Sequence, residues 1–295
     1  MKKLLWILPL LLALSCGEKG GKMPWEDDLG SGNTPVEKPE PEPEPENPTP
    51  ENPTPENPNP DKPTDGSVVV GPVLPAWSEG ELDIHTISTG RGECLFFILP
   101  DGTTMVVDAG EFSREPSDYK NVIQRPNASV RPRQVYADYI NHFMPKGKIG
   151  LDYMHLSHFH MDHMGNLETE YVKDPSGTYT LAGVTALYHL IGFREVIDRA
   201  YGNYEGLKVN SMSEAALANY RKFLDYQVGH KALKASQFQL GAVNQFAMKY
   251  NAAAYPDFKI EIVCSNCKIW EHGKAVDIYA GKSKAENAAS CGCVS

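Results

Sequence analysis

The segment Leu156–Leu167, LSHFHMDHMGNL, concentrates three histidines and an aspartate within six positions: His158, His160, Asp162 and His163. Imidazole and carboxylate are ligands that suit zinc, and also manganese or iron where carboxylate contributes more. In a loop, His158 and His160 can direct their rings to one ion, while Asp162 and His163 turn toward a second. A metal held there lowers the pKa of a bound water and polarises an ester or phosphoryl oxygen. The spacing therefore predicts a metal site with hydrolytic chemistry.

The elements that must position this loop follow a pattern of strands and helices. Before residue 108, LDIHTIST, CLFFILP and DGTTMVVDAG predict three strands separated by glycine and proline turns. LDYMHLSH predicts a strand that leads into the histidine loop, and FKIEIVCSN a later strand. QVYADYINHFMPKG and SEAALANYRKFLDYQVG have helical spacing, the second with Ser213 as its N-cap. Strands alternating with helices predict an α/β or layered fold, with Asp108 at the end of a strand.

The first residues, MKKLLWILPLLLALSC, predict a signal peptide over residues 1–16, because the apolar run is too short to span a membrane. Cys16 directly after Ala-Leu-Ser resembles the lipobox of bacterial lipoproteins, in which the cysteine is lipidated; ordinary signal cleavage is the alternative reading. Lipidation of Cys16 would attach the protein to a membrane of the bacterial cell envelope, on the periplasmic side or at the cell surface.

Residues 17–66 differ in composition from the rest of the chain. They contain the repeat ENPTP-ENPTP-ENPNP and carry 13 acidic and 4 basic residues. Proline and repelling glutamates favour an extended chain that cannot bury a core, so this segment is predicted to be a disordered tether. Of the net charge of −10, the tether supplies −9 and Lys2 and Lys3 add +2, which leaves −3 for residues 67–295. This nearly neutral domain lacks the basic run of a nucleic-acid-binding face.

The cysteines other than Cys16 leave several readings open. Cys94 lies in the apolar run CLFFIL and is expected to be buried. Cys264 and Cys267 form one close pair, and Cys291 and Cys293 another. The two pairs are compatible with a structural zinc site, with a disulfide in an oxidising compartment, or with unpaired thiols, and the missing knuckle glycines favour the last.

The order of these motifs resembles a known family. SHFHMDHMGNL is similar to the H-x-H-x-D-H motif of the metallo-β-lactamase superfamily, and GRGECLFFILPDGTTMVVDAG resembles the entry strands of its ComEC/Rec2-related branch. The resemblance covers about residues 82–167. It implies an αββα sandwich, usually with two zinc ions, and hydrolysis by a metal-bound hydroxide. It also implies that His158 and His160 bind the first metal, that Asp162 and His163 bind the second with Asp162 catalytic, and that Asp108 braces the histidine loop.

The later part of the chain departs from this family pattern. The branch continues to a Gly-Asp whose aspartate bridges the metals and then to a late histidine, whereas no Gly-Asp follows the cluster here. Of the histidines after His163, His189 is expected to be packed, His230 to cap a helix or be solvated, and His272 to lie in a turn. The closing KAENAASCGCVS resembles the start of the strand that leads to the Gly-Asp. We therefore expect residues 67–295 to be a partial domain that lacks its C-terminal portion.

Two functions follow as expectations. The first is a lipid-anchored, metal-dependent hydrolase, for which the family branch favours phosphodiester, nucleotide or other ester substrates over lactams. The second is a catalytically inactive, truncated and membrane-anchored binding protein, which the missing bridging aspartate favours. A serine nucleophile is disfavoured because the chain has no G-x-S-x-G motif.

Overall fold

A computed structural model describes residues 74–112, 123–168, 170–205, 207, 209–280 and 290–294. The predicted signal peptide, Cys16 and the predicted tether lie outside these residues. The described residues from Ala76 onward belong to one unit with two sheets and four α-helices among them. The fold is mixed α/β, as the alternation of strand and helix patterns predicts.

The larger sheet has six strands in the order of the chain, β1-β2-β3-β4-β5-β6. The first three strands pair antiparallel, and β3 to β6 run parallel. Their bounds are β1 Asp83–Thr86, β2 Leu95–Ile98, β3 Thr104–Val107, β4 Leu151–His155, β5 Phe193–Asp198 and β6 Lys234–Gln237. The parallel half places the ends of β3 and β4 side by side, so that the segments after them meet at one edge.

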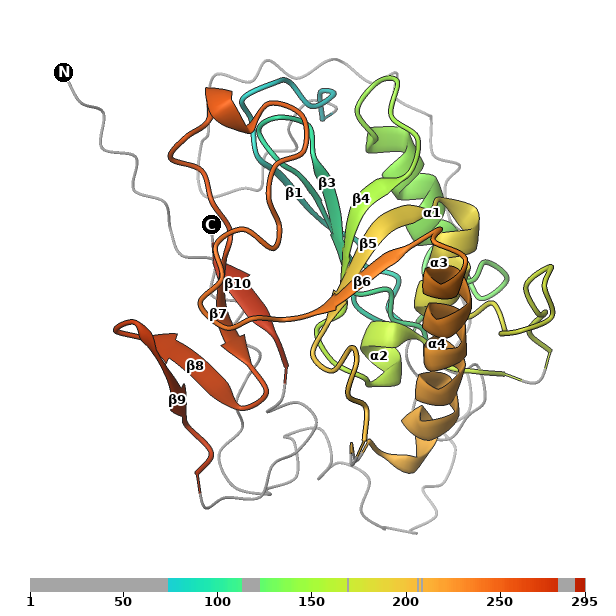
Figure 1. Cartoon of the computed structure of the whole chain (residues 1–295). Coiled ribbons are helices and arrows are strands. Elements are labelled where there is room, and N and C mark those ends of the chain that lie inside the picture. The colour runs from blue at the N-terminus through green and yellow to red at the C-terminus, as the bar shows by residue number, and fades with distance from the viewer. Residues whose placement is uncertain are drawn as a thin grey trace, which may run out of the picture. The chain divides into compact units, whose positions relative to one another are not determined.

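Helices cover one face of this sheet and a second sheet lies against the other (Figure 1). The helices are α1 Pro132–Phe143, α2 Met161–Met164, α3 Gly183–Leu190 and α4 Ser211–Gly229. The second sheet is antiparallel in the order β10-β7-β8-β9, with bounds β7 Glu261–Ser265, β8 Lys268–Glu271, β9 Lys274–Asp277 and β10 Gly292–Val294. A short 3₁₀ turn, Ala252–Ala254, precedes it. The described chain therefore forms three layers: helices, sheet and sheet.

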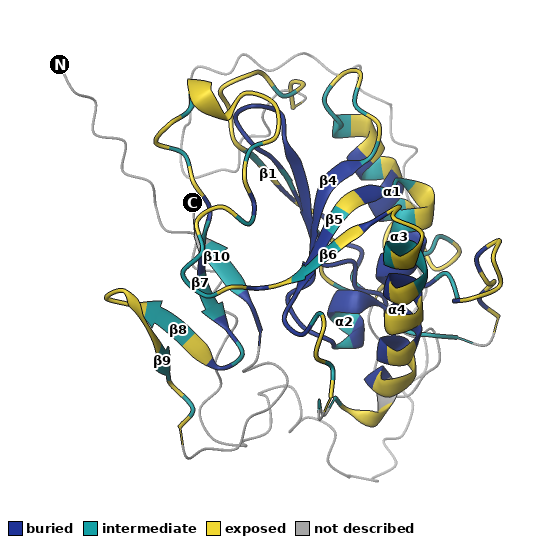
Figure 2. Ribbon diagram, viewed as in Figure 1, coloured by how far each residue is buried: buried dark blue, intermediate teal, exposed yellow. Residues whose placement is uncertain are grey.

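Two apolar cores hold these layers together. Between the helices and the larger sheet, Tyr136 of α1, Met154 of β4 and Phe223 of α4 are almost fully buried. Between the two sheets, Tyr153 of β4 and Ile262 of β7 are buried in a second cluster. Figure 2 shows β4 buried and the exposed residues of α4 on its outer side. All five residues of β4, LDYMH, are buried, as expected for a strand that is covered on both faces.

The second sheet also reaches the loop that follows β4. The backbone N–H of Cys291, just before β10, donates to the carbonyl oxygen of Ser157 at 3.0 Å. The Nε2 of His155 lies 3.3 Å from the carbonyl oxygen of Cys291. His155 itself packs against the ring of Phe238, with 4.7 Å between ring centroids. These contacts tie the end of the described chain to the histidine loop.

Several expectations about single residues are tested by these elements. The structure confirms buried Cys94, and it places His230 at the exposed C-cap of α4 and His272 in the turn between β8 and β9. The prediction that Ser213 is an N-cap is wrong: Asn210 caps α4, and its Oδ1 accepts from the N–H of Ser213. The prediction that His189 is packed is also wrong, because the last turn of α3 leaves it exposed.

No disulfide joins the described cysteines, and where β7 pairs with β10 Cys264 lies opposite Gly292. No described helix combines the length and the apolar character that crossing a membrane requires.

Candidate metal site

The predicted ligands lie at the edge where β3 and β4 end. Asp108 directly follows β3, and the segment Leu156–His160 follows β4 and leads into α2. His160 is the residue before α2, whose single turn carries Asp162 and His163. The carboxyl edge of parallel strands is where open α/β sheets commonly bind ligands, because loops from neighbouring strands converge there.

Three segments that are distant in sequence are joined by backbone hydrogen bonds around this edge. The N–H of Glu93 donates to the carbonyl oxygen of Asp162 at 2.8 Å, and the N–H of Ala109 donates to that of His163 at 2.8 Å. The N–H of Gly110 donates to the carbonyl oxygen of Glu93 at 2.9 Å. A Cβ atom on Gly110 would lie 1.6 Å from the carbonyl oxygen of Asp162, so only glycine fits between these segments.

Asp108 is the buried centre of the polar contacts. Its carboxylate accepts from the N–H of Ser157 at 2.8 Å and from the Ser157 hydroxyl at 2.7 Å, and Oδ2 lies 2.7 Å from Nδ1 of His163. Burial alone would raise the pKa of this carboxyl, but attraction to His163 and these hydrogen bonds hold the pKa below its usual value. Asp108 has a φ of 61°, a left-handed conformation that aspartate tolerates better than most residues.

Ser157 fixes which nitrogen of His158 is available. Since the single Ser157 hydroxyl hydrogen is donated to Asp108, the hydroxyl oxygen accepts from Nδ1 of His158, 3.0 Å away. The Nε2 of His158 then carries a lone pair, and this buried atom has no hydrogen-bond partner among the described residues. Burial, followed by repulsion from His163, lowers the pKa of His158 to about 3, so the ring is neutral at physiological pH. A neutral imidazole with a free, buried Nε2 is a suitable metal ligand.

His163 lies between two carboxylates. Its Nδ1 faces Asp108, and its Nε2 lies 3.4 Å from Oδ2 of Asp162. Burial would lower the pKa of His163, but Asp108 and Asp162 together raise it to about 10. The pKa of Asp162, which burial alone would raise, falls below its usual value because of His163. In the metal-free protein the imidazolium therefore offsets one of the two negative charges, and a cation that binds Nε2 must displace a proton.

Glu93 is a potential ligand that lies outside the histidine motif. Its Oε2 lies 3.3 Å from Nδ1 of His163. Together with Asp108 and His163 it forms a group whose ligand atoms lie within 4.8 Å of one another and could hold a metal ion. Burial, and the charges of Asp108 and Asp162, raise the pKa of Glu93 against the effect of His163. The sequence feature that could have indicated this ligand is the position of Glu93 directly after the Gly-Arg-Gly turn, which faces the Asp-Ala-Gly segment.

The structure places the four predicted ligands near one another, but only His163 among them belongs to the group of described residues whose ligand atoms could hold one ion; Asp108, predicted to brace the loop, is also in that group. The rings of His158 and His163 have centroids 3.9 Å apart, and those of His158 and His160 are 4.9 Å apart. The Nδ1 of His163 is directed at Asp108 rather than at the other predicted ligands. By contrast, the later histidines, His189, His230 and His272, are exposed and belong to other elements.

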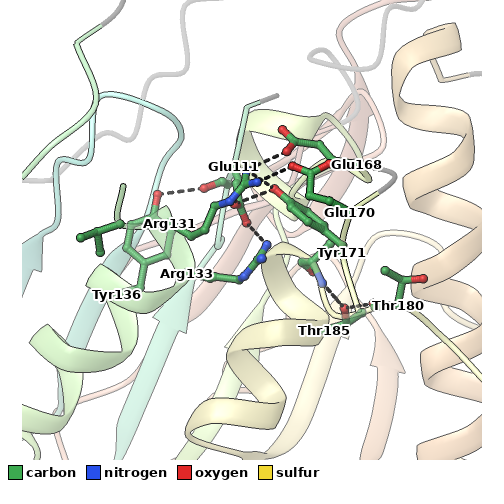
Figure 3. A network of polar contacts seen from close by, with 12 residues as sticks. Glu111, Arg131, Arg133, Tyr136, Glu168, Glu170, Tyr171, Thr180 and Thr185 are labelled. Atoms are coloured by element: carbon green, nitrogen blue, oxygen red, sulfur yellow. Dashed lines mark hydrogen bonds and ion pairs between the residues drawn. The ribbon is translucent and has the colours of Figure 1, made fainter. Parts of the chain in front are cut away.

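A buried ion network supports the cluster from one side. Glu111, fully buried, accepts from Nη1 of Arg133 at 2.8 Å and from the hydroxyl of Tyr171 at 2.8 Å (Figure 3). Arg131 lies beside it and pairs with Glu168 at 2.7 Å. The backbone N–H of Glu111 donates to the carbonyl oxygen of Met161, the first residue of α2. The network therefore fixes the helix that carries Asp162 and His163.

Comparison with known proteins gives no match, either among models of protein families or among curated protein sequences. The function proposed below therefore depends on the residues and contacts described above.

Proposed function

We propose that this chain is a metal-dependent hydrolase of the metallo-β-lactamase type, held at the bacterial cell envelope by a lipid on Cys16. Phosphodiesters or other esters, including nucleotides, are its proposed substrates. The H-x-H-x-D-H motif and the Asp-Ala-Gly segment support the family assignment. The described layers, helices against a sheet against a second sheet, agree with the first three layers of an αββα sandwich.

The observation that carries this proposal is the free Nε2 of His158. A buried polar atom without a partner costs free energy, and a bound ion is one of the explanations for retaining such an atom. Here the atom carries a lone pair, because Ser157 engages the other ring nitrogen. The neighbouring donors are imidazole and carboxylate, which match zinc and, with more carboxylate, manganese or iron.

Each residue of the cluster would have its own role. His158, His160, Asp162 and His163 would hold one or two cations, with Glu93 as an additional carboxylate. Asp108 and Ser157 would orient His163 and His158, as hydrogen-bonded partners of metal ligands commonly do. A bound divalent metal supplies Lewis acidity and lowers the pKa of water, which is the chemistry that ester hydrolysis requires. Asp162, half-buried beside His163, would accept a proton during turnover.

The test uses the full chain, supplied with Zn²⁺ or Mn²⁺, and a chromogenic phosphodiester. We expect metal-dependent turnover, and we expect the double variant His158→Ala/Asp162→Ala to reduce both metal content and turnover by about a hundredfold or more. Metal content is measured independently by elemental analysis after dialysis. The matched control is His189→Ala/Asp225→Ala, in which both side chains belong to helices away from the cluster. Turnover that survives in the first double variant would refute this site.

A second candidate is a membrane-anchored binding protein without catalysis. It is favoured by the exposed positions of His189, His230 and His272, which leave the cluster with ligands from the described segments before residue 164. In that case the purified chain binds one metal equivalent, unfolds cooperatively and hydrolyses no ester. Metal content and turnover, measured on the same preparation, separate the two functions.

A further inference from the structure

A cavity of about 680 Å³ lies at the opposite edge of the larger sheet from the histidine cluster. It is lined at the starts of three parallel strands, by Leu151 of β4, Phe193 of β5 and Lys234 of β6. The histidine cluster follows the ends of β3 and β4, so the length of the strands separates the two places. The cavity is therefore a candidate site of its own.

The charged residues that line the cavity are four cations and two carboxylates. Both carboxylates are already paired: Asp152 lies 3.0 Å from Nζ of Lys148, and Glu195 lies 3.4 Å from Nζ of Lys249. Asp152 also accepts from the hydroxyl of Tyr250 at 2.6 Å and from the N–H of Thr104 at 2.9 Å. These carboxylates are thus largely neutralised before the remaining cations are considered.

Three cations remain. No carboxylate in the described part of the chain lies within ion-pair distance of Lys231 or Lys234. The one described carboxylate within ion-pair distance of Arg194 is that of Asp152, with 3.8 Å between Nε and Oδ1, and the Arg194 side chain is 71% exposed. This positive charge at the cavity contrasts with the net charge of −3 of residues 67–295. A cavity with a local excess of cations attracts anions.

Helix ends explain only part of this charge. Cations stabilise the C-terminus of a helix, and Lys231 follows the end of α4 closely enough to have that role. Arg194 and Lys234, however, are strand residues of β5 and β6. Their charges do not complete a helix terminus, so helix capping does not account for them.

The walls between these cations are apolar or aromatic. Tyr188 and Ile191 line the cavity from the end of α3. Half-exposed Tyr250 lines it from a different segment of the chain. The guanidinium group of arginine and the ammonium groups of lysine suit phosphate oxygens, while tyrosine and isoleucine offer contact to a ring or chain. The combination fits an anionic group attached to an organic body.

We propose that this cavity is a second ligand site, which binds the phosphate group of an organic phosphate through Arg194, Lys231 and Lys234. Tyr188, Ile191 and Tyr250 would contact the organic part. This site is independent of the proposed hydrolase activity, because it shares no residue with the histidine cluster.

The experiment titrates pyrophosphate into the metal-free full chain by calorimetry, with a chelator present during purification so that the histidine cluster holds no metal. The test variant is Arg194→Gln/Lys231→Gln/Lys234→Gln. The control variant, Lys222→Gln/Lys268→Gln/Lys274→Gln, removes the same charge from exposed positions on α4, β8 and β9. We expect binding to weaken by about tenfold or more in the test variant only. We also expect citrate to bind more weakly than pyrophosphate.

Three outcomes would overturn the proposal: no pyrophosphate binding to the wild type, equal weakening in both variants, or tighter binding of citrate. Vesicles that contain an anionic phospholipid distinguish the source of the phosphate. If they compete with pyrophosphate for the wild type but not for the test variant, the bound group is a lipid headgroup. If they do not compete, the bound group is a free phosphate.

Discussion

Nδ1 of His163 lies 2.7 Å from Oδ2 of Asp108, although 55 positions separate the two residues in the chain. Both side chains are almost fully buried. The contact joins the end of β3 to α2, so that the predicted metal ligand on α2 is held by a carboxylate from the centre of the sheet. The charge of this pair and the shape of its surroundings can be tested separately.

Replacing Asp108 by asparagine removes the charge and retains a side chain that tolerates the left-handed backbone. We expect the free energy of unfolding of the metal-free chain to fall by about 3 kcal/mol, because His163 loses its buried partner. Asp108→Ala should cost about 1 kcal/mol more, since alanine is disfavoured at a φ of 61°. Urea denaturation followed by circular dichroism measures both. An asparagine variant as stable as the wild type would mean that the pair contributes nothing.

Replacing Ser157 by alanine should affect metal binding more than folding. Without the hydroxyl, Nδ1 of His158 loses its partner, and the ring is free to rotate or to exchange tautomers. We expect Zn²⁺ affinity to fall by about ten- to a hundredfold, the range for residues that orient metal ligands. Competition with a chromogenic chelator gives the affinity. Ser129→Ala, at an exposed serine, is the control and should bind as the wild type does.

Gly110 tests the close approach of the segments around the cluster. A Cβ there meets the carbonyl oxygen of Asp162, so Gly110→Ala should lower the free energy of unfolding by about 4 kcal/mol or more, or prevent folding. Gly229→Ala is the matched control, because its Cβ would meet no atom within 4 Å and it lies in α4. That change should raise stability by about 0.5 kcal/mol. Equal effects of the two variants would contradict the packing described for Gly110.

The ion network around Arg131 and Arg133 contains a buried and an exposed carboxylate. Glu111→Gln should lower the free energy of unfolding by about 3 kcal/mol, because Arg133 and Tyr171 lose a charged partner inside the protein. Glu170→Gln removes an exposed partner of Arg131, and its effect should be close to zero. Thermal melts of the two variants side by side provide the comparison. If Glu170→Gln lowered stability more than Glu111→Gln, the buried carboxylate of Glu111 would not be the stabilising one.

The hydrogen bonds of Asp101 should make the stability of the fold depend on pH. Its carboxylate accepts from the backbone N–H groups of Thr103, Tyr250 and Asn251 at 2.9, 2.7 and 3.0 Å. Burial would raise its pKa, but these hydrogen bonds hold the pKa below the usual 3.8. Since the folded-state pKa is the lower one, the stabilisation is complete above the unfolded-state pKa and is lost as the pH falls toward the folded-state pKa.

We therefore expect Asp101→Asn to be less stable than the wild type at about pH 7, and the gap to narrow by about pH 3. Urea unfolding at both pH values, with wild type and variant compared at each, isolates Asp101 from the other carboxylates. A gap that stays constant or widens in acid would show that the carboxylate charge does not stabilise the fold.

The sequence predicted the half of the fold that carries local signals. The three strands before Asp108, the strand into the histidine loop and the long helix have clear periodicity or turn residues, and each is present. The strand β5 was missed, because its first residue, Phe193, continues the mostly apolar stretch LYHLIGF, in which Gly192 is the single break between α3 and β5. The hairpin β8–β9 was missed because its exposed positions are mostly charged, so that its strands lack a clear apolar pattern.

At the site, sequence spacing identified residues that share a loop but not the partners that orient them. The histidine cluster is contiguous, and so its residues could be found by type. Ser157 and Glu93 act through contacts with Asp108, His158 and His163 that depend on how β2, β3 and β4 are placed. Such contacts arise from sheet pairing, which single-residue patterns do not encode.

The bond between the N–H of Cys291 and the carbonyl oxygen of Ser157 has a consequence for the order of assembly during synthesis. The related contact of His155 with Cys291 spans 136 positions, so neither can form while that length of chain is still being translated. Contacts of such long range close late in folding. The histidine loop is thus synthesised well before the residue that holds it, so cation capture is expected only after Cys291 has been translated.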